Sequence, residues 1–395
     1  MANHPILRLK PREGRRARGG APWIFSNEIV LDADAKSLAP GALVQVEGDD
    51  GRRFGLGMFN PGSLIAVRLL DAAEDSAIDR RFFAERMARA LALREALYDK
   101  PYYRLVHAEG DRLPGLVVDR FGETCSLQIT TAGMEALVES VVAALDDVVS
   151  PANVVLRADA PARSQEGLAS YVRAVKGDAP HHLALVENGA RYFADPMTGQ
   201  KTGWYFDQRD NRAFMAELAR GRTVLDLYCH SGGFAVLAAQ ADAREVHGID
   251  SSAAALALAT DGAAANAVSG VCRFLKADAM QELERLAGSS EQFDVVVCDP
   301  PPFVKSRKDL EAGARAYRKL ARLAARIASR GGFLLLASCS HNMPQERFQA
   351  ECAAGIARAG RSATLIRAAG AGPDHPVHPM LPETAYLKAL VYALD

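Results

Sequence analysis

Four aspartates in the second half of the chain end or follow four consecutive apolar runs, at Asp226, Asp250, Asp278 and Asp299. If the runs are parallel strands, their carboxyl ends meet at one edge of a sheet, which is where open α/β folds bind ligands. An acid at the tip of the second strand can accept hydrogen bonds from both hydroxyls of a ribose. We therefore expect Asp250 to hold a ribose and Asp278 to accept a hydrogen bond from an adenine amine.

A glycine turn lies between the first two of these runs, in the segment TVLDLYCHSGGF (223–234). Gly232 and Gly233 let the backbone approach a ligand closely, because glycine has no side chain to obstruct it. An alanine-rich helical pattern follows the turn. The turn is not G-x-G-x-x-G, so a pyrophosphate-binding dinucleotide site, and with it a nicotinamide oxidoreductase, is disfavoured.

The elements that must position these residues alternate between apolar strand patterns and helical patterns. The predicted strands are 223–228, 245–249, 271–275, 293–298, 332–337, 362–367 and 386–394. Strands alternating with helices predict an α/β domain with a doubly wound, largely parallel sheet. The last strand follows a Pro-rich loop and precedes no helix, which leaves room for it to enter antiparallel.

The N-terminal region has a different pattern. Short alternating strands are separated by turn sequences at 40–41, 49–51 and 60–62, which predicts a small β-barrel over residues 1–73. A basic segment precedes the barrel, and its arginines Arg12, Arg15, Arg16 and Arg18 are predicted to contact RNA phosphates.

A central α+β domain is predicted over residues 74–190, and an α/β domain over 191–395. In the central domain the pattern is helical from Ser76 to Leu97 and again over 132–147. Predicted strands there are 103–107, 115–119, 124–130 and 153–157. Asn188-Gly189 lies between alternating apolar residues, which predicts a hairpin over 182–195 with a type I′ turn.

Composition limits the class of protein. The 395 residues hold 47 lysines and arginines against 48 acids, so nucleic-acid binding requires local patches. Six cysteines are scattered without a C-x-x-C pair, and no apolar run approaches the ~18 residues of a membrane span. We expect a cytoplasmic protein with reduced thiols and no membrane contact. We expect no metal site at Cys229 and His230, because a second pair of ligands is missing.

Several motifs resemble one known family through most of the chain. They are PWIFSNEI (22–29), LPGLVVDRFG (113–122), KTGWYFDQRDNR (201–212), DPPPFV (299–304), ASCSHNM (337–343) and DHPVHPMLPETAYLK (374–388). The chain resembles the RlmI/RlmK-type methyltransferases of large-subunit ribosomal RNA. The resemblance implies an N-terminal PUA barrel, a central α+β domain and a C-terminal Rossmann-like class I methyltransferase. It also implies S-adenosylmethionine as cofactor and large-subunit rRNA as substrate.

The resemblance places the cofactor pocket in the polar loop before the first strand and in the residues that follow the strands. The residues so assigned are Lys201, Thr202, Tyr205, Asp207, Gln208, Arg209, Asp226, Tyr228, Gly232, Gly233, Phe234, Asp250, Ser251, Asp278, Ala279, Asp299 and Pro300. The chain departs from the family at Pro302, at the glycines of RRARGGAPW (15–23) and in the turn YCHSGG (228–233). The departure at the start of the barrel affects how RNA is held.

Cys339 and Asp299 are the predicted catalytic residues. Cys339 follows an apolar strand at the ligand edge, between Ser338 and Ser340, and S-C-S here resembles the nucleophile motif of RNA 5-methylcytosine enzymes. Carbon C5 of cytosine is a poor nucleophile until a thiolate adds at C6, so this chemistry needs an activated cysteine. A related family has a second cysteine three residues after the motif aspartate. That position here is Pro302, so Cys298 is given no role.

Other functions remain open at this stage. N-methylation of guanine would use the DPPPF loop and no thiol, and a non-catalytic RNA-binding assembly factor would keep the fold and a bound cofactor. The target nucleotide, the base that removes H5 and the formation of a homodimer are not determined by the sequence.

Overall fold

The computed structural model describes residues 4–72, 76–178 and 180–395, and the chain forms two compact units. The first, here the N-terminal unit, contains the residues up to His181 together with Asp195–Trp204 and Pro373–Pro382. The second, the C-terminal unit, contains His182–Ala194, Tyr205–Gly372 and Glu383–Asp395. Each unit is thus discontinuous in sequence. The predicted boundary between residues 73 and 74 lies outside the described residues.

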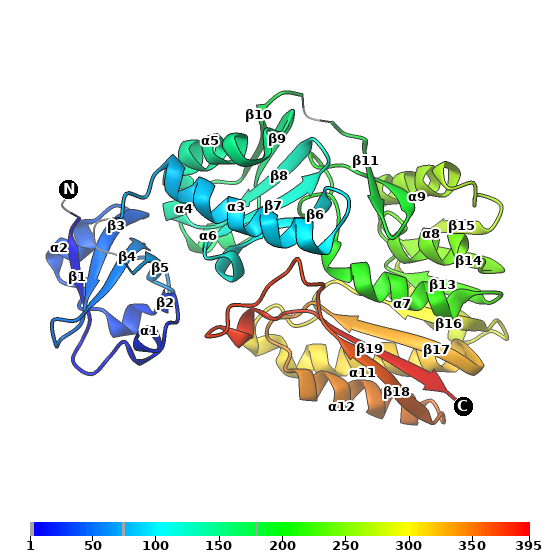
Figure 1. The fold of residues 1–395 in the computed structure, drawn as a ribbon. Coiled ribbons are helices and arrows are strands. Elements are labelled where there is room, and N and C mark those ends of the chain that lie inside the picture. Colours follow the sequence, from blue (N-terminus) through cyan, green and yellow to red (C-terminus); the bar gives the residue numbers. More distant parts are fainter. Residues whose placement is uncertain (1–3, 73–75, 179) are drawn as a thin grey trace. The chain divides into compact units, whose positions relative to one another are not determined.

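The start of the N-terminal unit is a five-stranded sheet with the order β1-β3-β4-β5-β2 (Figure 1). Its strands are β1 (Ile6–Arg8), β2 (Trp23–Ile24), β3 (Ala42–Glu47), β4 (Arg53–Phe59) and β5 (Val67–Asp71). β1 is parallel to β3 and the other pairs are antiparallel. A Cβ on Gly55 would lie 1.9 Å from the carbonyl oxygen of Asp71, so glycine is required where β4 passes β5.

A second five-stranded sheet follows in the same unit, with the order β10-β9-β8-β7-β6. Its strands are β6 (Tyr102–His107), β7 (Leu116–Phe121), β8 (Thr124–Ile129), β9 (Asn153–Ala158) and β10 (Tyr171–Lys176). The sequence did not predict β10. The predicted helix over 132–147 is two helices, α4 (Ala132–Ala136) and α5 (Val138–Val149).

The helix predicted from Ser76 begins later, as α3 (Arg80–Leu97), because the Asp79 side chain accepts a hydrogen bond from the Phe82 N–H and caps it. Arg94 of α3 is fully buried. Its guanidinium forms an ion pair with Asp111 at 2.6 Å and donates to the Arg104 carbonyl oxygen at 2.8 Å. Burial of this charge is tolerated because its donors are engaged.

In the C-terminal unit, the predicted hairpin is β11 (Leu183–Glu187) with β12 (Ala190–Ala194). Asn188 and Gly189 both have positive φ angles, 51° and 82°, as a type I′ turn requires. The predicted hairpin is confirmed.

The predicted doubly wound sheet is also confirmed, as seven strands in the order β15-β14-β13-β16-β17-β19-β18 (Figure 1). These are β13 (Thr223–Leu227), β14 (Glu245–Asp250), β15 (Cys272–Lys276), β16 (Phe293–Cys298), β17 (Ala328–Ser338), β18 (Ala363–Ala369) and β19 (Lys388–Leu394). β19, the last strand, is antiparallel to both β17 and β18, and the pairs from β15 to β17 are parallel.

Helices cover both faces of this sheet because side chains along a strand point alternately to its two faces. Val224, Val295 and Val297 pack with α7 (Arg209–Ala219) and α8 (Gly233–Gln240). Leu225 and Val296 pack in a separate cluster on the other face. That cluster includes residues of α10 (Ala279–Ala287), α11 (Leu310–Ile327) and α12 (Gln345–Arg358). Across residues 4–72, 76–178 and 180–395, no helix has the length and apolar character to cross a membrane.

Candidate active site

The carboxyl ends of β13, β14 and β16 bring three of the predicted acids together in the C-terminal unit. Asp226 lies in β13, Asp250 ends β14 and Asp299 directly follows β16. β13 pairs in parallel with both of the other strands. Burial is the main cause of the raised pKa of Asp226, and the charges of Asp299 and Asp250 raise this pKa further, so the three carboxyl groups interact electrostatically.

Asp226 is the most deeply buried of these acids, with 1% of its surface exposed. One carboxyl oxygen, Oδ2, accepts a hydrogen bond from the Ala235 N–H at 3.0 Å. The other, Oδ1, has no hydrogen-bond partner among the described residues. Burial raises the pKa of Asp226 to about 8, and the neighbouring carboxylates add to the rise. A cationic ligand beside this group would favour its ionised form.

The turn after β13 has an unusual backbone. Tyr228 and His230, with φ angles of 64° and 49°, occupy the left-handed region that non-glycine residues rarely adopt. Asp250 holds this turn, because its carboxylate accepts hydrogen bonds from the His230 N–H at 3.0 Å and the Ser252 N–H at 2.8 Å. A carboxylate offers about four acceptor positions, so others remain for a ligand. Strained backbone of this kind is common at binding sites.

The two glycines of the turn are required by packing inside the protein. A Cβ on Gly232, whose φ is 78°, would lie 3.0 Å from the Ala259 Cβ. A Cβ on Gly233 would lie 2.5 Å from the Arg212 Nε. The close passage of both glycines to a ligand stays a prediction.

Four residues of the predicted polar loop lie in the C-terminal unit, where side chains of the same unit contact them: Tyr205, Asp207, Gln208 and Arg209. Burial raises the pKa of Tyr205, and the charges of Asp207, Asp299, Cys339 and Asp250 raise it further. Tyr205 is therefore close to the acids of the sheet edge.

The other three are engaged within the protein. The Asp207 carboxylate accepts a hydrogen bond from the Tyr386 hydroxyl at 2.5 Å. Gln208 accepts one from Asn211 at 2.7 Å, and Arg209 lies 3.7 Å from the Glu187 carboxylate. Gln208 and Arg209 thus shape the loop, and their contact with a cofactor stays a prediction.

Lys201 and Thr202, the first two residues of that motif, belong to the N-terminal unit. The Thr202 hydroxyl donates a hydrogen bond to the Asp119 carboxylate there. Lys201 has a positive φ of 51°. Their role as cofactor residues stays a prediction.

The remaining predicted cofactor residues differ in exposure. Asp278 is exposed and caps α10 by accepting a hydrogen bond from the Gln281 N–H at 2.8 Å, and Ser251 is exposed as well. Phe234, Ala279 and Pro300 are buried, which leaves little side-chain surface for a ligand. Any contact of these three would be mainly through the backbone.

Cys339 directly follows β17, and its thiol faces the loop after β16. The Cys339 Sγ lies 4.0 Å from the Pro300 carbonyl oxygen, and its side chain is half-buried. The flanking serines point inward: the Ser338 hydroxyl donates to the Tyr317 hydroxyl at 2.8 Å, and the Ser340 hydroxyl lies 2.9 Å from the same oxygen. The serines therefore fix the backbone around the thiol.

Lys388 is a residue of this site that the sequence reasoning missed. It is 5% exposed, it pairs with Ser338 in the register of β17 and β19, and its Nζ donates to the Ser340 and Tyr386 carbonyl oxygens at 2.7 and 2.9 Å. Burial lowers the pKa of Lys388, and interaction with the Cys339 thiolate opposes this. A lysine at the start of an otherwise apolar strand was the available signal.

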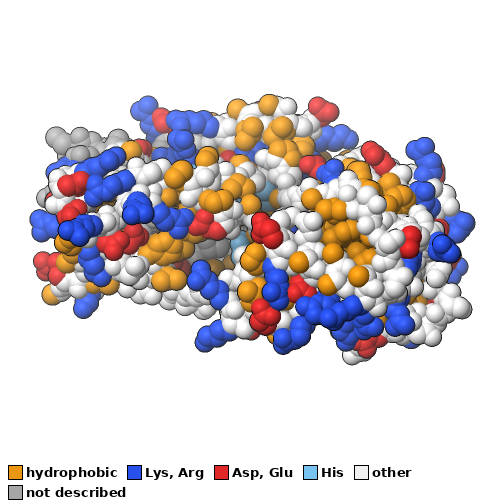
Figure 2. All heavy atoms as spheres, turned by 90° about the horizontal axis from the view of Figure 1, so that it is seen from below, with side chains coloured by type: hydrophobic (Ala, Val, Ile, Leu, Met, Phe, Trp, Pro, Cys, Tyr) orange, Lys and Arg blue, Asp and Glu red, His pale blue; other side chains and the backbone are white. Residues whose placement is uncertain are grey.

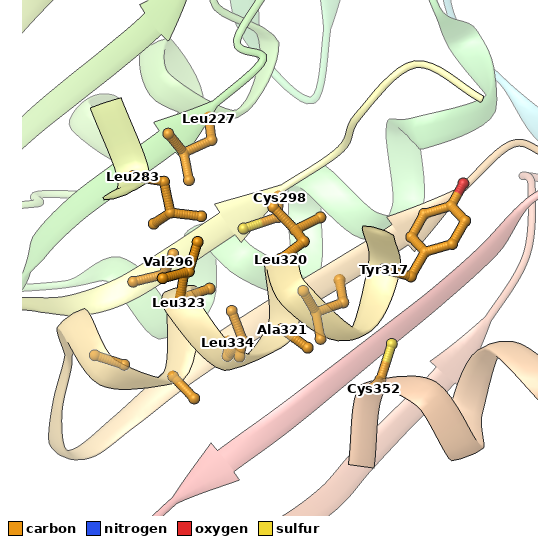
Figure 3. Packing of buried hydrophobic residues seen from close by; sticks show 14 of the residues in the cluster. Leu227, Leu283, Val296, Cys298, Tyr317, Leu320, Ala321, Leu323, Leu334 and Cys352 are labelled. Atoms are coloured by element: carbon orange, nitrogen blue, oxygen red, sulfur yellow. The ribbon is translucent and has the colours of Figure 1, made fainter. Parts of the chain in front are cut away.

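Cys298 has a different environment. Figure 3 shows its side chain within the buried cluster that includes Leu227, Val296 and Leu320. Burial raises the pKa of Cys298, and the charge of Asp226 raises it further. The thiolate form is disfavoured in such surroundings.

The arginines predicted to bind RNA lie in and near the short helix α1 (Arg15–Arg18) of the N-terminal unit. Arg12 and Arg15 are exposed. The Arg16 guanidinium lies 5.7 Å from the centre of the Phe25 ring, and Arg18 forms an ion pair with Asp50 at 2.6 Å. The charge of Arg18 is therefore partly neutralised within the protein.

Comparison with known families gives two matches. A PUA-like domain matches residues 7–72, and the S-adenosylmethionine-dependent methyltransferase family matches residues 166–393. The chain is 36% identical to "Ribosomal RNA large subunit methyltransferase I" of Shewanella amazonensis, over 98% of both chains. It is 35% identical to the protein of the same name from Pseudoalteromonas atlantica, over 94% of both chains.

Solved structures share the whole fold at lower identity. A SAM-dependent methyltransferase from Streptococcus mutans has a TM-score of 0.83 and 19% identity, with 98% of this chain and 100% of that chain covered. A methyltransferase solved with SAH has a TM-score of 0.85, with the same identity and coverage. These matches confirm the predicted fold class: an N-terminal PUA-like domain and a Rossmann-like class I methyltransferase fold.

Proposed function

We propose that this chain, which belongs to the S-adenosylmethionine-dependent methyltransferase family, methylates carbon C5 of a cytosine in large-subunit ribosomal RNA. S-adenosylmethionine is its cofactor, and when bound it supplies an electrophilic methyl group. The relatives named ribosomal RNA large subunit methyltransferase I are similar over nearly the full chain, which supports the substrate class.

The charge of the sheet edge supports the position proposed for the cofactor. The acidic side chains of Asp226, Asp250 and Asp299 interact electrostatically at this edge, and a positively charged ligand beside them would favour the ionised form of Asp226. S-adenosylmethionine carries a positive sulfonium and a positive ammonium group, whereas a nicotinamide dinucleotide carries a negative pyrophosphate. Such a site favours the former. In the proposal Asp250 accepts hydrogen bonds from the ribose hydroxyls, and Asp278 accepts one from the adenine amine.

One observation carries the choice of cytosine C5: a half-buried thiol at this edge faces the loop that follows Asp299. In the proposed reaction the Cys339 thiolate adds to C6 of the cytosine, which makes C5 nucleophilic. The methyl group that C5 takes up would leave the sulfonium of S-adenosylmethionine as S-adenosylhomocysteine is released. A base then removes the proton from C5, and the electrons of that C–H bond expel the thiolate from C6. The C6–S bond breaks last and returns the thiolate. Atoms and charge balance without a redox partner.

Two further residues have proposed roles in this reaction. The Asp299 carboxylate is suited to accept a hydrogen bond from the exocyclic amine of cytosine, as acids do in base recognition. Lys388 and Tyr317 hold the Cys339 loop through its flanking serines. They position the nucleophile.

We also propose that RNA is presented by the parts of the chain before the methyltransferase domain. The proposed division is a PUA-like barrel over 1–73, a central domain over 74–190 and the methyltransferase over 191–395. The family match at 7–72 and the exposed Arg12 and Arg15 support an RNA-binding role for the barrel.

Methyl transfer from isotopically labelled S-adenosylmethionine to unmodified large-subunit rRNA tests the proposal. Mass spectrometric mapping of the product should find 5-methylcytidine. If the product is N2-methylguanosine, the protein methylates a guanine nitrogen and the proposal of cytosine C5 is wrong. No transfer to naked rRNA, precursor particles or assembled subunits would favour a non-catalytic assembly factor.

A further inference from the structure

The segment from Lys305 to Arg330 has an unusual charge. It contains nine lysines and arginines and only two acids, although the whole chain has a net charge of −1. The basic residues are Lys305, Arg307, Lys308, Arg315, Arg318, Lys319, Arg322, Arg326 and Arg330. This segment begins in the loop after Asp299 and continues through α11, so the charge lies next to the proposed active site in sequence.

Five of these residues form one row on α11, here called the α11 basic stripe: Arg315, Arg318, Lys319, Arg322 and Arg326. They recur every three or four residues, which places them on one face of a helix. The opposite face is apolar and buried, as shown by Tyr317, Leu320 and Ala324. With 18 residues, α11 is about 27 Å long, so the stripe presents a positive charge at about every helical turn.

Much of this charge is not neutralised by the protein. Arg318 pairs with Glu351, and Lys319 pairs with Glu284. Arg315, Arg322 and Arg326 form no ion pair with any residue that the structure describes. Figure 2 views the molecule from the side on which α11 and α12 lie in Figure 1, and it shows Lys and Arg side chains gathered on this part of the C-terminal unit.

The stripe starts near the thiol of the site. Tyr317 lies two residues after Arg315, the first arginine of the stripe, on the opposite, buried face of α11, and it contacts the two serines that flank Cys339. Val304, in the loop after Asp299, packs closely on Gly313 at the start of the helix. Because α11 connects the carboxyl end of β16 to the start of β17, the stripe extends from the proposed catalytic edge along the outside of the domain.

We propose that the α11 basic stripe binds the phosphate backbone of the RNA strand that flanks the target nucleotide. This inference rests on the proposed function, because it takes the substrate to be RNA. A row of basic side chains along one helix, of which Arg315, Lys319 and Arg326 are exposed and Arg318 and Arg322 half-buried, fits the regular negative charges of one strand. It requires no base contacts. The stripe would give affinity and register, while the sheet edge selects the base.

The test compares two variants with the same change in charge. The stripe variant is Arg315→Gln/Arg322→Gln/Arg326→Gln, which leaves no acid without its ion-pair partner. The control is Arg191→Gln/Arg220→Gln/Arg244→Gln, three exposed arginines elsewhere in the C-terminal unit. Arg244 pairs with Asp294 at 3.5 Å, an exposed contact whose loss should affect stability little. Binding to a large-subunit rRNA fragment is measured from low to physiological salt. Cofactor affinity, measured by calorimetry, checks that both variants are folded.

We expect the stripe variant to lose at least about tenfold in RNA affinity at low salt, and its salt slope to fall by about 2 to 3, since each phosphate contact contributes about 0.7 to 0.9. The control variant should retain the wild-type slope. Suppose that the wild-type protein binds RNA and transfers methyl groups, and that the stripe variant has the same salt slope as the wild type. This result would overturn the inference about the stripe and leave the proposed function standing. The inference would also be overturned if the stripe variant lost binding to anionic lipid vesicles and kept the RNA affinity of the wild type. Absence of RNA binding and methyl transfer in the wild type would remove the proposed function itself.

Discussion

The two halves of the carboxyl edge of the seven-stranded sheet are built differently. At β13 and β14, Asp226 accepts a hydrogen bond from the Ala235 N–H of α8, and Asp250 accepts one from the His230 N–H of a turn in which non-glycine residues adopt positive φ angles. At β16 and β17, a single thiol is surrounded by a loop that distant side chains fix, namely those of Tyr317 and Lys388. The first half presents carboxylate acceptors held by backbone groups. The second presents one half-buried thiol, the proposed nucleophile, on a supported backbone.

This difference means that changes in the two halves should affect different steps. Substitutions at the β13 and β14 ends should weaken cofactor binding, and those at the β16 and β17 ends should slow methyl transfer with the cofactor affinity unchanged. Measuring both quantities for each variant therefore tests the division directly.

The largest effect is expected from Cys339→Ala. We expect methyl transfer to fall by about 10³-fold or more, because the proposed reaction assigns the addition at C6 to this thiol. Cofactor and RNA affinities should stay within about twofold of the wild type. Single-turnover methylation with saturating cofactor is the measurement.

Cys298→Ala is the matched control for this change. Cys298 is buried in the apolar core, so its loss should lower thermal stability slightly and leave most of the methyl transfer activity. If the Cys339→Ala and Cys298→Ala variants lose activity equally, methyl transfer does not depend on Cys339 in particular. The role given to the β16 and β17 half of the edge would then be wrong.

Asp250→Ala should have the next largest effect. In the proposal two ribose hydroxyls donate hydrogen bonds to the Asp250 carboxylate. Loss of this charged acceptor should cost about 2–4 kcal/mol, or roughly 30-fold to 1,000-fold in cofactor affinity. Asp250→Asn keeps one acceptor oxygen and should show a smaller loss. Calorimetric titration with S-adenosylmethionine measures both. Unchanged affinity in the alanine variant would show that the ribose lies elsewhere.

Asp226 should make cofactor binding depend on pH. Its folded-state pKa of about 8 means that the carboxyl group is largely protonated at pH 6 to 7 in the empty protein. A cationic cofactor favours the ionised form, so binding should release a proton, and affinity should rise by up to about tenfold per pH unit until about pH 8. Asp226→Asn should remove this dependence. Equal proton release by both proteins, measured in buffers of different ionisation enthalpy, would exclude Asp226 as the source.

The smallest effect is expected from Tyr317→Phe. This change removes the hydroxyl that joins Ser338 and Ser340, and it should lower the free energy of unfolding by about 1–2 kcal/mol. It should also slow methyl transfer by about tenfold or less, with an unchanged cofactor affinity. Thermal unfolding and kcat are the measurements. A weakened cofactor affinity would mean that the two halves are not independent.

Local signals in the sequence predicted much of the fold. Asn188-Gly189 requires a specific turn and has it. The apolar runs that contain Asp226 or lead to Asp250 and Asp299 form neighbouring strands of the sheet. The Pro-rich loop before the last strand left room for it to enter antiparallel, and β19 does so. These predictions succeeded because each depends on residues close together in the chain.

The support around the thiol could not be predicted in the same way. Lys388 bonds to Ser340 across 48 residues, and Tyr317 across 23, so no local pattern indicates either contact. The burial of Arg94 likewise depends on Asp111 and on the carbonyl oxygen of Asp374, which lies 280 residues away. Such contacts are fixed only when the sheets and helices are assembled.

Trapping of a covalent adduct tests the central claim most directly. RNA that carries 5-fluorocytidine at the target position should form a complex with the wild-type protein that survives denaturation, because fluorine cannot leave as a proton does. Peptide mapping should place the cross-link on Cys339, and the complex should require S-adenosylmethionine. If methylation of cytosine C5 proceeds while no adduct forms, or if the adduct maps to another cysteine, Cys339 is not the nucleophile.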